Sequence, residues 1–394
     1  MDDLKLALVL LLRFLLRALR VLPVRRGRVA FVAFNGARFA CNPKYISEYL
    51  EAAHPGALEL VWLLDAPERH AFLRARGLRT VRFRSLAGLA VLATARVVVT
   101  NTGLPAYLSF RRGQVLVNTW HGGGAYKKCG YDLPIGRAEA RKLALTSRDT
   151  ALFLSSSRRF SEVMAHSIRL PSGRMWEIGM PRNDLLLAVR PDLRAAVRAR
   201  YGLAPDVRIL LHAPTFRGGA SSAVDTPDAL DYPACLAALA ARFGGTWAAL
   251  RRAHQAVRPD AGAHAGALDA SDHPDMQELL SAADVLVTDY SSAMWDMSLT
   301  GRPCFIYAPD LDGYRRERDF YTPVDEWPFP VATSLPELRE RIASFDEGTY
   351  AQAVRAHHAA LGNCETGHAA RDAGERIRAL CLDGGPARTE EGRA

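Results

Sequence analysis

Short apolar runs that each end in a polar or glycine-containing turn recur along this chain of 394 residues. Residues 97–99 are three valines followed by Thr100 and Asn101, and the run 115–117 is followed by Asn118. Such runs are too short for helices and are typical of buried strands. Longer segments of helical composition separate them. Strands that alternate with helices predict parallel sheets covered by helices on both faces, so we expect an α/β fold with doubly wound, Rossmann-like domains.

The expected elements follow this alternation from residue 28 onward. We expect strands at 29–34, 58–64, 97–101, 115–119, 151–154, 175–178, 208–211, 246–254, 285–288 and 304–307. We expect helices at 43–53, 86–95, 185–201, 275–283 and 292–300.

The length exceeds that of one typical domain, which predicts two domains that face each other across a cleft. We expect an N-terminal domain at 24–200 and a C-terminal domain at 201–382, preceded by a helix at 1–23 and followed by a mobile tail at 383–394.

The first residues are leucine-rich and carry Arg13, Arg17 and Arg20 on one helical face. A membrane-spanning helix needs roughly 20 apolar residues, and each central arginine costs about 2.5–3.5 kcal/mol. Neither a basic start nor a small-residue cleavage site of a secretory signal is present. We therefore expect an amphipathic helix in the plane of an anionic membrane surface, with its arginines at the headgroups. Three further basic residues extend the strip: Arg25, Arg26 and Arg28. The alternative is a surface helix docked on the protein's own core.

The formal net charge is +9, which favours an anionic partner. Neither an aromatic RNA-binding platform nor a zinc finger is recognisable, so we do not expect nucleic acid binding. The six cysteines include no CxxC pair, which indicates reduced thiols rather than disulfides or a zinc site.

A histidine follows the apolar run 115–117, at the end of a strand where open α/β sheets place ligands. Glycines beside it allow the backbone to approach a bound group, and two lysines add positive charge. A base beside an anion-binding turn indicates chemistry on a phosphorylated substrate. The alternative is a common glycine turn with a structural histidine. The candidate residues here are Trp120, His121, Gly122, Gly123 and Gly124.

A second candidate segment follows the run 285–288. Ser291 and Ser292 stand at an expected helix start, where unpaired N–H groups bind phosphate, although serine is also a common N-cap. Asp296 lies one turn further on and either holds ligand hydroxyls or is a solvated carboxylate.

Several basic residues come at the ends of expected strands. Arg182 and Arg217 each follow a strand through a proline-containing turn, and Arg252 stands just before His254. A guanidinium makes planar, charge-assisted contacts to phosphate oxygens. Each alone is more often a surface residue, but together they predict a phosphate-binding rim.

Five segments between residues 28 and 330 resemble the CDP-glycerol glycerophosphotransferase family, whose members build teichoic-acid-like and capsular poly(alditol phosphate) at the cytoplasmic face of the membrane. The segments occur in the family's order. They are Phe34-Asn35-Gly36 with Asn42-Pro43-Lys44-Tyr45 and Glu48-Tyr49-Leu50; Thr119-Trp120-His121-Gly122; Gly179-Met180-Pro181-Arg182-Asn183-Asp184; Ala213-Pro214-Thr215-Phe216-Arg217; and Thr288-Asp289-Tyr290-Ser291-Ser292 continuing to Asp296.

The resemblance implies a GT-B-like fold in which the C-terminal domain holds most of the nucleotide. It implies that His121 deprotonates the acceptor hydroxyl and that His254 and Arg182 contact the donor phosphates. The CDP-alditol pocket would be lined by Thr215, Phe216, Ser291, Ser292 and Asp296. The sequence departs from the family pattern at Gly123-Gly124, which replace a usual threonine-proline, and at Ala253 and Gln255, which replace a leucine and a proline beside His254.

The implied reaction is attack of an acceptor hydroxyl on the phosphorus that bears the alditol, with release of CMP. An imidazole has an ordinary pKa of about 6.5, which suits a base near neutrality. The expected donor is CDP-glycerol or CDP-ribitol, and the expected acceptor is a lipid-linked glycan or poly(alditol phosphate). The residues require neither a metal nor a cofactor. Two alternatives stay open, a GT-B glycosyltransferase with a UDP- or GDP-sugar donor and an inactive membrane scaffold of the same fold.

Overall fold

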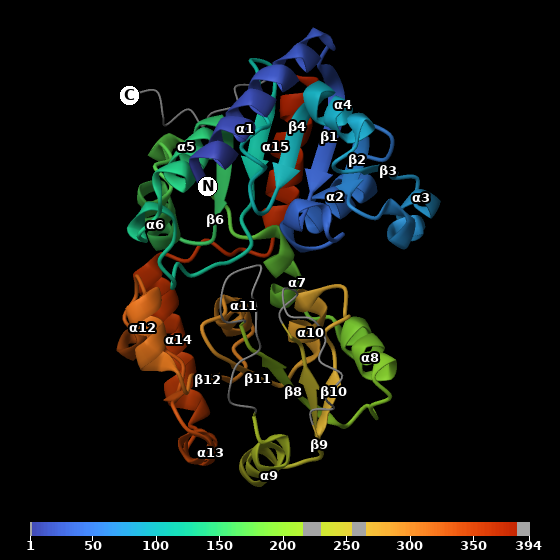
Figure 1. Ribbon diagram of the computed structural model, residues 1–394. Helices are drawn as coiled ribbons and strands as arrows, with labels where there is room; N and C mark the ends of the chain where they lie inside the picture. Colours follow the sequence, from blue (N-terminus) through green and yellow to red (C-terminus); the bar gives the residue numbers. More distant parts are fainter. Residues whose placement is uncertain (1, 216–229, 254–264, 384–394) are drawn as a thin grey trace. The chain divides into compact units, whose positions relative to one another are not determined.

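A computed structural model describes residues 2–215, 230–253 and 265–383. By contact density the chain divides into two compact units. The first unit contains the described residues up to His121, together with Lys128–Asp184 and the chain from Asn363 onward. The second unit contains Gly122–Lys127 and Leu185–Gly362. Figure 1 shows the elements of both units in the colours of the sequence.

The first unit is built on a seven-stranded parallel sheet with the order β3-β2-β1-β4-β5-β6-β7. Along the sequence, strands β1 to β3 are added toward one edge of the sheet, and strands β4 to β7 are added toward the other edge. The crevice between the ends of β1 and β4 is therefore a topological switch point, where ligands bind in open α/β sheets. The strands are β1 (Arg25–Val32), β2 (Glu59–Leu64), β3 (Arg79–Arg82), β4 (Ala95–Thr100), β5 (Val115–Asn118), β6 (Thr150–Ser155) and β7 (Met175–Glu177).

The second unit repeats this arrangement with a six-stranded parallel sheet of order β10-β9-β8-β11-β12-β13. Its switch point lies between β8 and β11 for the same topological reason. The strands are β8 (Arg208–Ala213), β9 (Trp247–Arg251), β10 (Ala267–Asp269), β11 (Val285–Thr288), β12 (Cys304–Tyr307) and β13 (Val331–Ala332).

Helices connect the strands of both sheets. In the first unit they are α1 (Asp2–Leu15), α2 (Cys41–Ala53), α3 (Ala71–Ala75), α4 (Leu86–Thr94), α5 (Arg137–Asp149), α6 (Arg158–Ser167) and α15 (Ala369–Leu382). In the second they are α8 (Pro191–Arg200), α9 (Tyr232–Phe243), α10 (Met276–Ala282), α11 (Ala293–Ser298), α12 (Leu311–Glu317), α13 (Leu335–Ala343) and α14 (Glu347–Leu361), and the short α7 (Asp184–Leu187) begins at the end of the first unit.

Alternating side chains of the first sheet pack into two separate apolar layers, because successive residues of a strand point to opposite faces. Val99 of β4 belongs to one layer with Ile46 of α2 and Ile377 of α15. Val98 belongs to the other layer with Leu92 of α4. Helices thus cover both faces, as the doubly wound prediction requires.

The last helix, α15, returns to the first unit and packs on α2 and β1. The approach is close, because a Cβ at Gly374 would lie 2.4 Å from the Tyr49 ring. The units therefore differ from the expected ranges 24–200 and 201–382, since α8 and α15 each pack in the other unit. Apart from Asp383, the tail expected at 383–394 lies outside the described residues.

All ten expected strands are present, with ends that differ by a few residues, but the prediction of a single helix at 185–201 is wrong. It is two helices, α7 and α8, because Pro191 removes a backbone donor and starts a new helix. Three edge strands were not expected, namely β3, β10 and β13.

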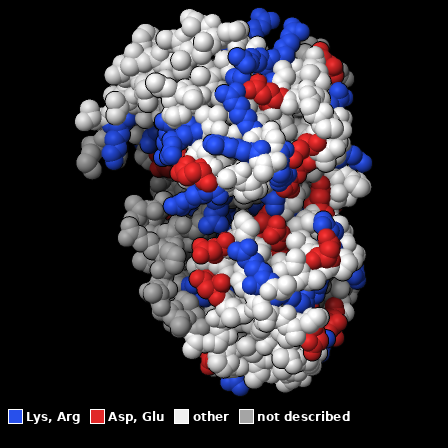
Figure 2. All heavy atoms as spheres, turned by 90° about the vertical axis from the view of Figure 1, so that its right-hand side faces the viewer, with Lys and Arg blue, Asp and Glu red and all other residues white. Residues whose placement is uncertain are grey.

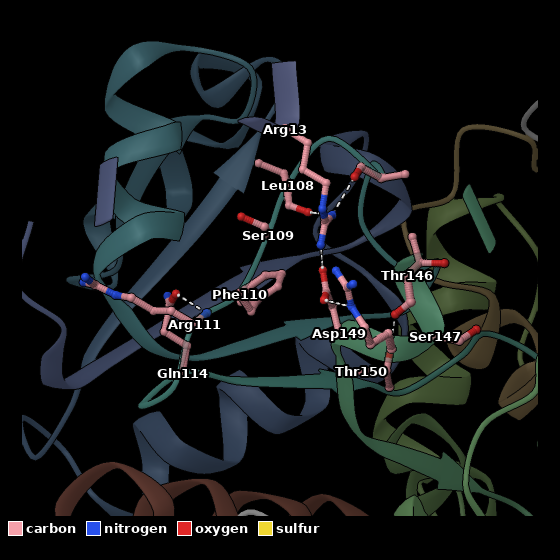
Figure 3. Close-up of polar contacts among 12 residues, drawn as sticks. Arg13, Leu108, Ser109, Phe110, Arg111, Gln114, Thr146, Ser147, Asp149 and Thr150 are labelled. Atoms are coloured by element: carbon pink, nitrogen blue, oxygen red, sulfur yellow. Dashed lines mark hydrogen bonds and ion pairs between the residues drawn. The ribbon is translucent and has the colours of Figure 1, made fainter. Parts of the chain in front are cut away.

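The N-terminal helix α1 is docked on the first unit through an arginine. Arg13 is 4% exposed and forms an ion pair with Asp149, at the end of α5. Its guanidinium also donates to the backbone carbonyls of Ala106 and Leu108. Figure 3 shows Arg13 pointing inward to these partners. The expectation that Arg13 contacts lipid headgroups is therefore wrong, whereas Arg17 and Arg20 are exposed.

The apolar side of α1 points outward instead. Leu4, Leu8, Leu11 and Leu15 form one stripe at helical spacing, and all four are exposed. The helix then continues as the 3-10 helix η1 (Leu16–Val21). Within the described chain, none of the helices has both the length and the apolarity needed to cross a bilayer.

Candidate functional site

The predicted base, His121, lies in the turn that follows β5, at the carboxyl end of the first sheet. Its Nδ1 is 2.8 Å from the carbonyl oxygen of Asn101. A carbonyl can only accept, so the neutral ring carries its proton on Nδ1 and its lone pair on Nε2. The ring of Trp120 stacks on the imidazole at 4.8 Å, and Phe34 contacts it edge-on at 6.1 Å. The imidazole is thus fixed in orientation and tautomer.

Asn42, the second residue of α2, holds the backbone of this turn. It is fully buried, and its side-chain Nδ2 donates to the carbonyls of Thr119 (3.0 Å) and Trp120 (3.1 Å). Its Oδ1 accepts from the backbone N–H of Arg182 at 3.1 Å. The Arg182 guanidinium then donates to the carbonyl of His121 at 2.5 Å. Arg182 is therefore brought to the predicted base, and its predicted contact with donor phosphates stays a prediction.

Asn101 lies at the switch point of the first sheet, directly after β4. Besides orienting His121 through its carbonyl, it accepts the backbone N–H of Phe34 on its Oδ1 at 2.8 Å, which joins the loops after β1 and β4. Its Nδ2 is buried without a hydrogen-bond partner among the described residues. Sequence reasoning placed Asn42 in a family segment and Asn101 at a strand end, but assigned neither residue a role.

The rest of the 179–184 segment attaches the returning C-terminal chain to the first unit. Glu365 accepts from the backbone N–H of Met180 and from Asn183 Nδ2, both at 2.8 Å. Asp184 accepts from the backbone N–H groups of Ala369 and Ala370, at the start of α15. Burial raises the pKa of Asp184, and these two N–H groups partly offset that effect.

The glycines after His121 belong to the second unit. A Cβ at Gly123 would lie 2.3 Å from Cδ1 of Trp295, and Gly124 has a φ of 76°. Tyr126, two residues further on, is buried and bonds His357 Nε2 at 2.9 Å. Burial lowers the pKa of His357 to about 4, so this ring is neutral near pH 7. Close packing and the positive φ thus explain why Gly123 and Gly124 are glycines. Gly122 is also buried in this segment.

At the switch point of the second sheet, Thr215 and Asp289 join the loops after β8 and β11. Asp289 accepts from the backbone N–H of Thr215 at 3.0 Å and from its hydroxyl at 2.9 Å. Ser291 Oγ accepts from the N–H of Ala293, the first residue of α11, and Ser292 is the N-cap position of that helix. The fold therefore brings the predicted residues Thr215, Ser291 and Ser292 to one switch point. Asp289 lies at the same point, although no role was predicted for it from the sequence.

Asp296 is buried rather than solvated, because its carboxylate accepts from Gln277 Nε2 at 2.9 Å and is 2% exposed. Arg252 follows β9, and its backbone N–H donates to the carbonyl of His212. Phe216, Arg217 and His254 lie outside the described residues. Over the described ranges, no group of three or more His, Cys, Asp or Glu side chains is arranged to hold a metal ion.

Comparison with known proteins gives consistent matches over most of the chain. The sequence pattern of a family described as CDP-Glycerol:Poly(glycerophosphate) glycerophosphotransferase matches residues 14–377. The chain is 29% identical over 351 residues to a teichoic acid poly(glycerol phosphate) polymerase of Bacillus spizizenii, covering 85% of this chain and 88% of the relative. It is 26% identical over 371 residues to a Staphylococcus epidermidis protein of the same name, covering 90% of this chain and 51% of the relative, so it spans about half of that protein.

Among solved structures, the wall teichoic acid polymerase TagF matches with a TM-score of 0.81 and 23% identity, covering 97% of this chain and 98% of that one. At this identity the match shows the fold. The chain therefore has a TagF-like, GT-B-like fold of two parallel α/β sheets with an N-terminal helix.

Proposed function

The chain belongs to the CDP-glycerol:poly(glycerophosphate) glycerophosphotransferase family, and from this membership we propose that it transfers an alditol phosphate from a CDP-alditol to a hydroxyl of a membrane-linked acceptor. Glycerol phosphate is the first candidate for the transferred group, and CMP is the leaving group. The observation that carries the proposal is the setting of His121, a histidine at the carboxyl end of a parallel strand with Nδ1 engaged by a carbonyl.

In this reaction, Nε2 of His121 accepts the proton of the acceptor hydroxyl as its oxygen attacks the phosphorus that bears the alditol. The bond from that phosphorus to the CMP oxygen breaks, and CMP departs as a stabilised phosphate. Because the leaving group is good, positioning and charge stabilisation account for more of the rate than a general acid does. The ordered imidazole supplies the base without further reorganisation.

The donor side is proposed at the switch point of the second sheet. The Thr215–Asp289 pair fixes the loop after β8, and Ser291 and Ser292 follow Asp289 in the loop after β11. Arg252 would add positive charge from the end of β9. These groups suit a nucleoside diphosphate, and family membership favours cytidine as the nucleoside.

We expect CDP to protect the protein against heat more strongly than UDP or GDP at equal concentration. A ligand at 100 times its Kd stabilises a protein by about 2.7 kcal/mol, which thermal shift resolves easily. Turnover is followed as CMP release from CDP-glycerol and CDP-ribitol with a membrane acceptor. Selectivity for uridine or guanosine, with turnover of the matching nucleotide sugar, would instead support a glycosyltransferase. Binding of CDP without turnover of any donor would support an inactive scaffold.

We also propose that the enzyme binds an anionic membrane surface peripherally, at the cytoplasmic face, through the outward side of α1. The leucine stripe supplies an apolar contact, and the exposed Arg17 and Arg20 supply positive charge beside it. In Figure 2, Lys and Arg side chains gather beside a broad area without charged residues on the first unit. This surface would bring the enzyme to a lipid-linked acceptor.

A triple variant with Leu4, Leu8 and Leu11 changed to serine is expected to lose most of its binding to vesicles that contain anionic phospholipid, because the apolar contact is removed. Co-flotation with vesicles measures the bound fraction. Leu86→Ser, which alters another exposed leucine of the first unit, is the matched control and should bind normally. Equal binding of the triple variant and wild type would contradict the assignment of α1. If a higher salt concentration leaves vesicle binding unchanged, the arginines do not contribute to that binding.

A further inference from the structure

We propose that Asn42 and Arg182 are positioning residues that hold the His121 turn, so that the 179–184 segment serves the base rather than only the donor. This inference rests on the proposed function, because it assumes that His121 is the base. It differs from what the resemblance implies for Arg182, which is a contact with the donor phosphates.

The turn needs such support because its backbone is strained. Trp120, directly before His121, has a φ of 52°, a left-handed conformation that bulky residues rarely adopt. Cys41, directly before Asn42, has a φ of 61°. Strained residues of this kind persist only where the surrounding structure fixes them, and they gather at functional sites. Here the two strained residues are joined by Asn42, which bonds the carbonyl of Trp120.

The contacts form a closed chain around the base. Asn42 bonds the carbonyls of the two residues before His121, Arg182 bonds the carbonyl of His121 itself, and Asn42 in turn holds the backbone N–H of Arg182. Three successive carbonyls of the turn are therefore fixed by two side chains. Because these side chains touch only the backbone of the turn in these contacts, they act on the direction of the imidazole and not on the reacting atoms.

The burial of Arg182 supports the same assignment. The residue is 5% exposed, and its Nη1 contacts Cys41 Sγ at 3.4 Å besides the His121 carbonyl. A guanidinium bonded to the His121 carbonyl and enclosed by protein is placed to stabilise the turn. Arginine suits this position better than lysine, because its planar fork can serve several acceptors at once.

The experiment compares Asn42→Ala and Arg182→Met with Ser47→Ala. Ser47 is a buried polar residue of the same helix, where it accepts from Trp62 Nε1, so it controls for lost stability. We expect kcat for CMP release to fall about 10–100-fold in the two test variants, as for a misdirected catalytic group. KM for CDP-glycerol should stay within about 3-fold of wild type in this interpretation, and Ser47→Ala should keep its kcat. Arg182→Lys should recover only part of the loss.

A second measurement does not depend on turnover. The ring resonances of His121, assigned by difference from His121→Gln, should change shift or broaden in Asn42→Ala and Arg182→Met and stay unchanged in Ser47→Ala. Unchanged His121 resonances in both test variants would overturn the proposal. So would a rise in KM for CDP-glycerol at unchanged kcat in Arg182→Met, which would indicate a phosphate contact. If His121→Gln itself keeps turnover, the assignment of His121 as the base fails, and if the wild type turns over no CDP-alditol, the proposed function fails. In either case the resonances still decide whether the turn is held.

A double variant tests whether the two residues act as one unit. Because Asn42 holds the backbone of Arg182, the loss of kcat in Asn42→Ala with Arg182→Met should be smaller than the product of the single losses. A fully multiplicative loss would show that they act independently and would contradict the closed chain of contacts.

Discussion

His121→Gln is expected to lower kcat for CMP release by about 10²–10⁴-fold, the usual contribution of a positioned general base. Glutamine keeps a polar side chain of similar reach but accepts no proton at neutral pH. The main chain of the turn is held by Asn42 and Arg182, so the fold should survive the change. CMP release under saturating CDP-glycerol measures the effect, with circular dichroism and thermal unfolding as checks of folding.

The control for this variant is Ser47→Ala, a buried polar change outside the candidate site, which should retain most of the activity. Near-normal turnover in a folded His121→Gln protein would refute the base assignment.

Arg13→Met is expected to destabilise the attachment of α1 by about 3 kcal/mol, the cost of leaving a buried ionic partner without its counterion. The change strands the Asp149 carboxylate and removes the donor to the Ala106 and Leu108 carbonyls. The estimate stays at the lower end because Arg148 also contacts Asp149 at 3.4 Å. Hydrogen exchange of the α1 amides should become on the order of 100-fold faster.

Arg17→Met is the matched control, since Arg17 lies one turn further along and is exposed. It should change the exchange of α1 little. Adding Asp149→Asn to Arg13→Met should recover part of the loss, because the stranded charge is removed. Equal exchange in Arg13→Met and Arg17→Met would show that the ion pair does not hold the helix.

The sequence predicts the fold well where the signal is local. Runs such as the valines of β4 are apolar on both faces, and this pattern identifies buried parallel strands. The strands that were missed lack it. β3 is Arg-Thr-Val-Arg at a sheet edge, and β13 has two residues, so neither differs from a loop in composition. The return of α15 was missed because its partners, α2 and β1, are more than 300 residues away along the chain.

The residues of the candidate site also divide into those with a local sequence signal and those without one. The place of His121 after β5 could be predicted because strand, turn and histidine are adjacent in sequence. The roles of Asn42 and Asn101 could not, because each depends on loops that only the folded sheet brings together. Arg13 illustrates the limit most clearly. Helical periodicity places it with Arg17 and Arg20, but its partner Asp149 lies 136 residues away and reverses which side of the helix faces the protein.

The position of α15 has a consequence for how the protein is made. One layer of the amino-terminal core is open until Ile377 and Leu380 have left the ribosome, which happens after residues 185–362 of the second unit have been made. Most of the second unit lies between the two parts of the first unit in the sequence, so its synthesis is complete earlier. We therefore expect the first unit to finish folding after the second unit has been made, and chains that end before α15 to lack a finished first unit.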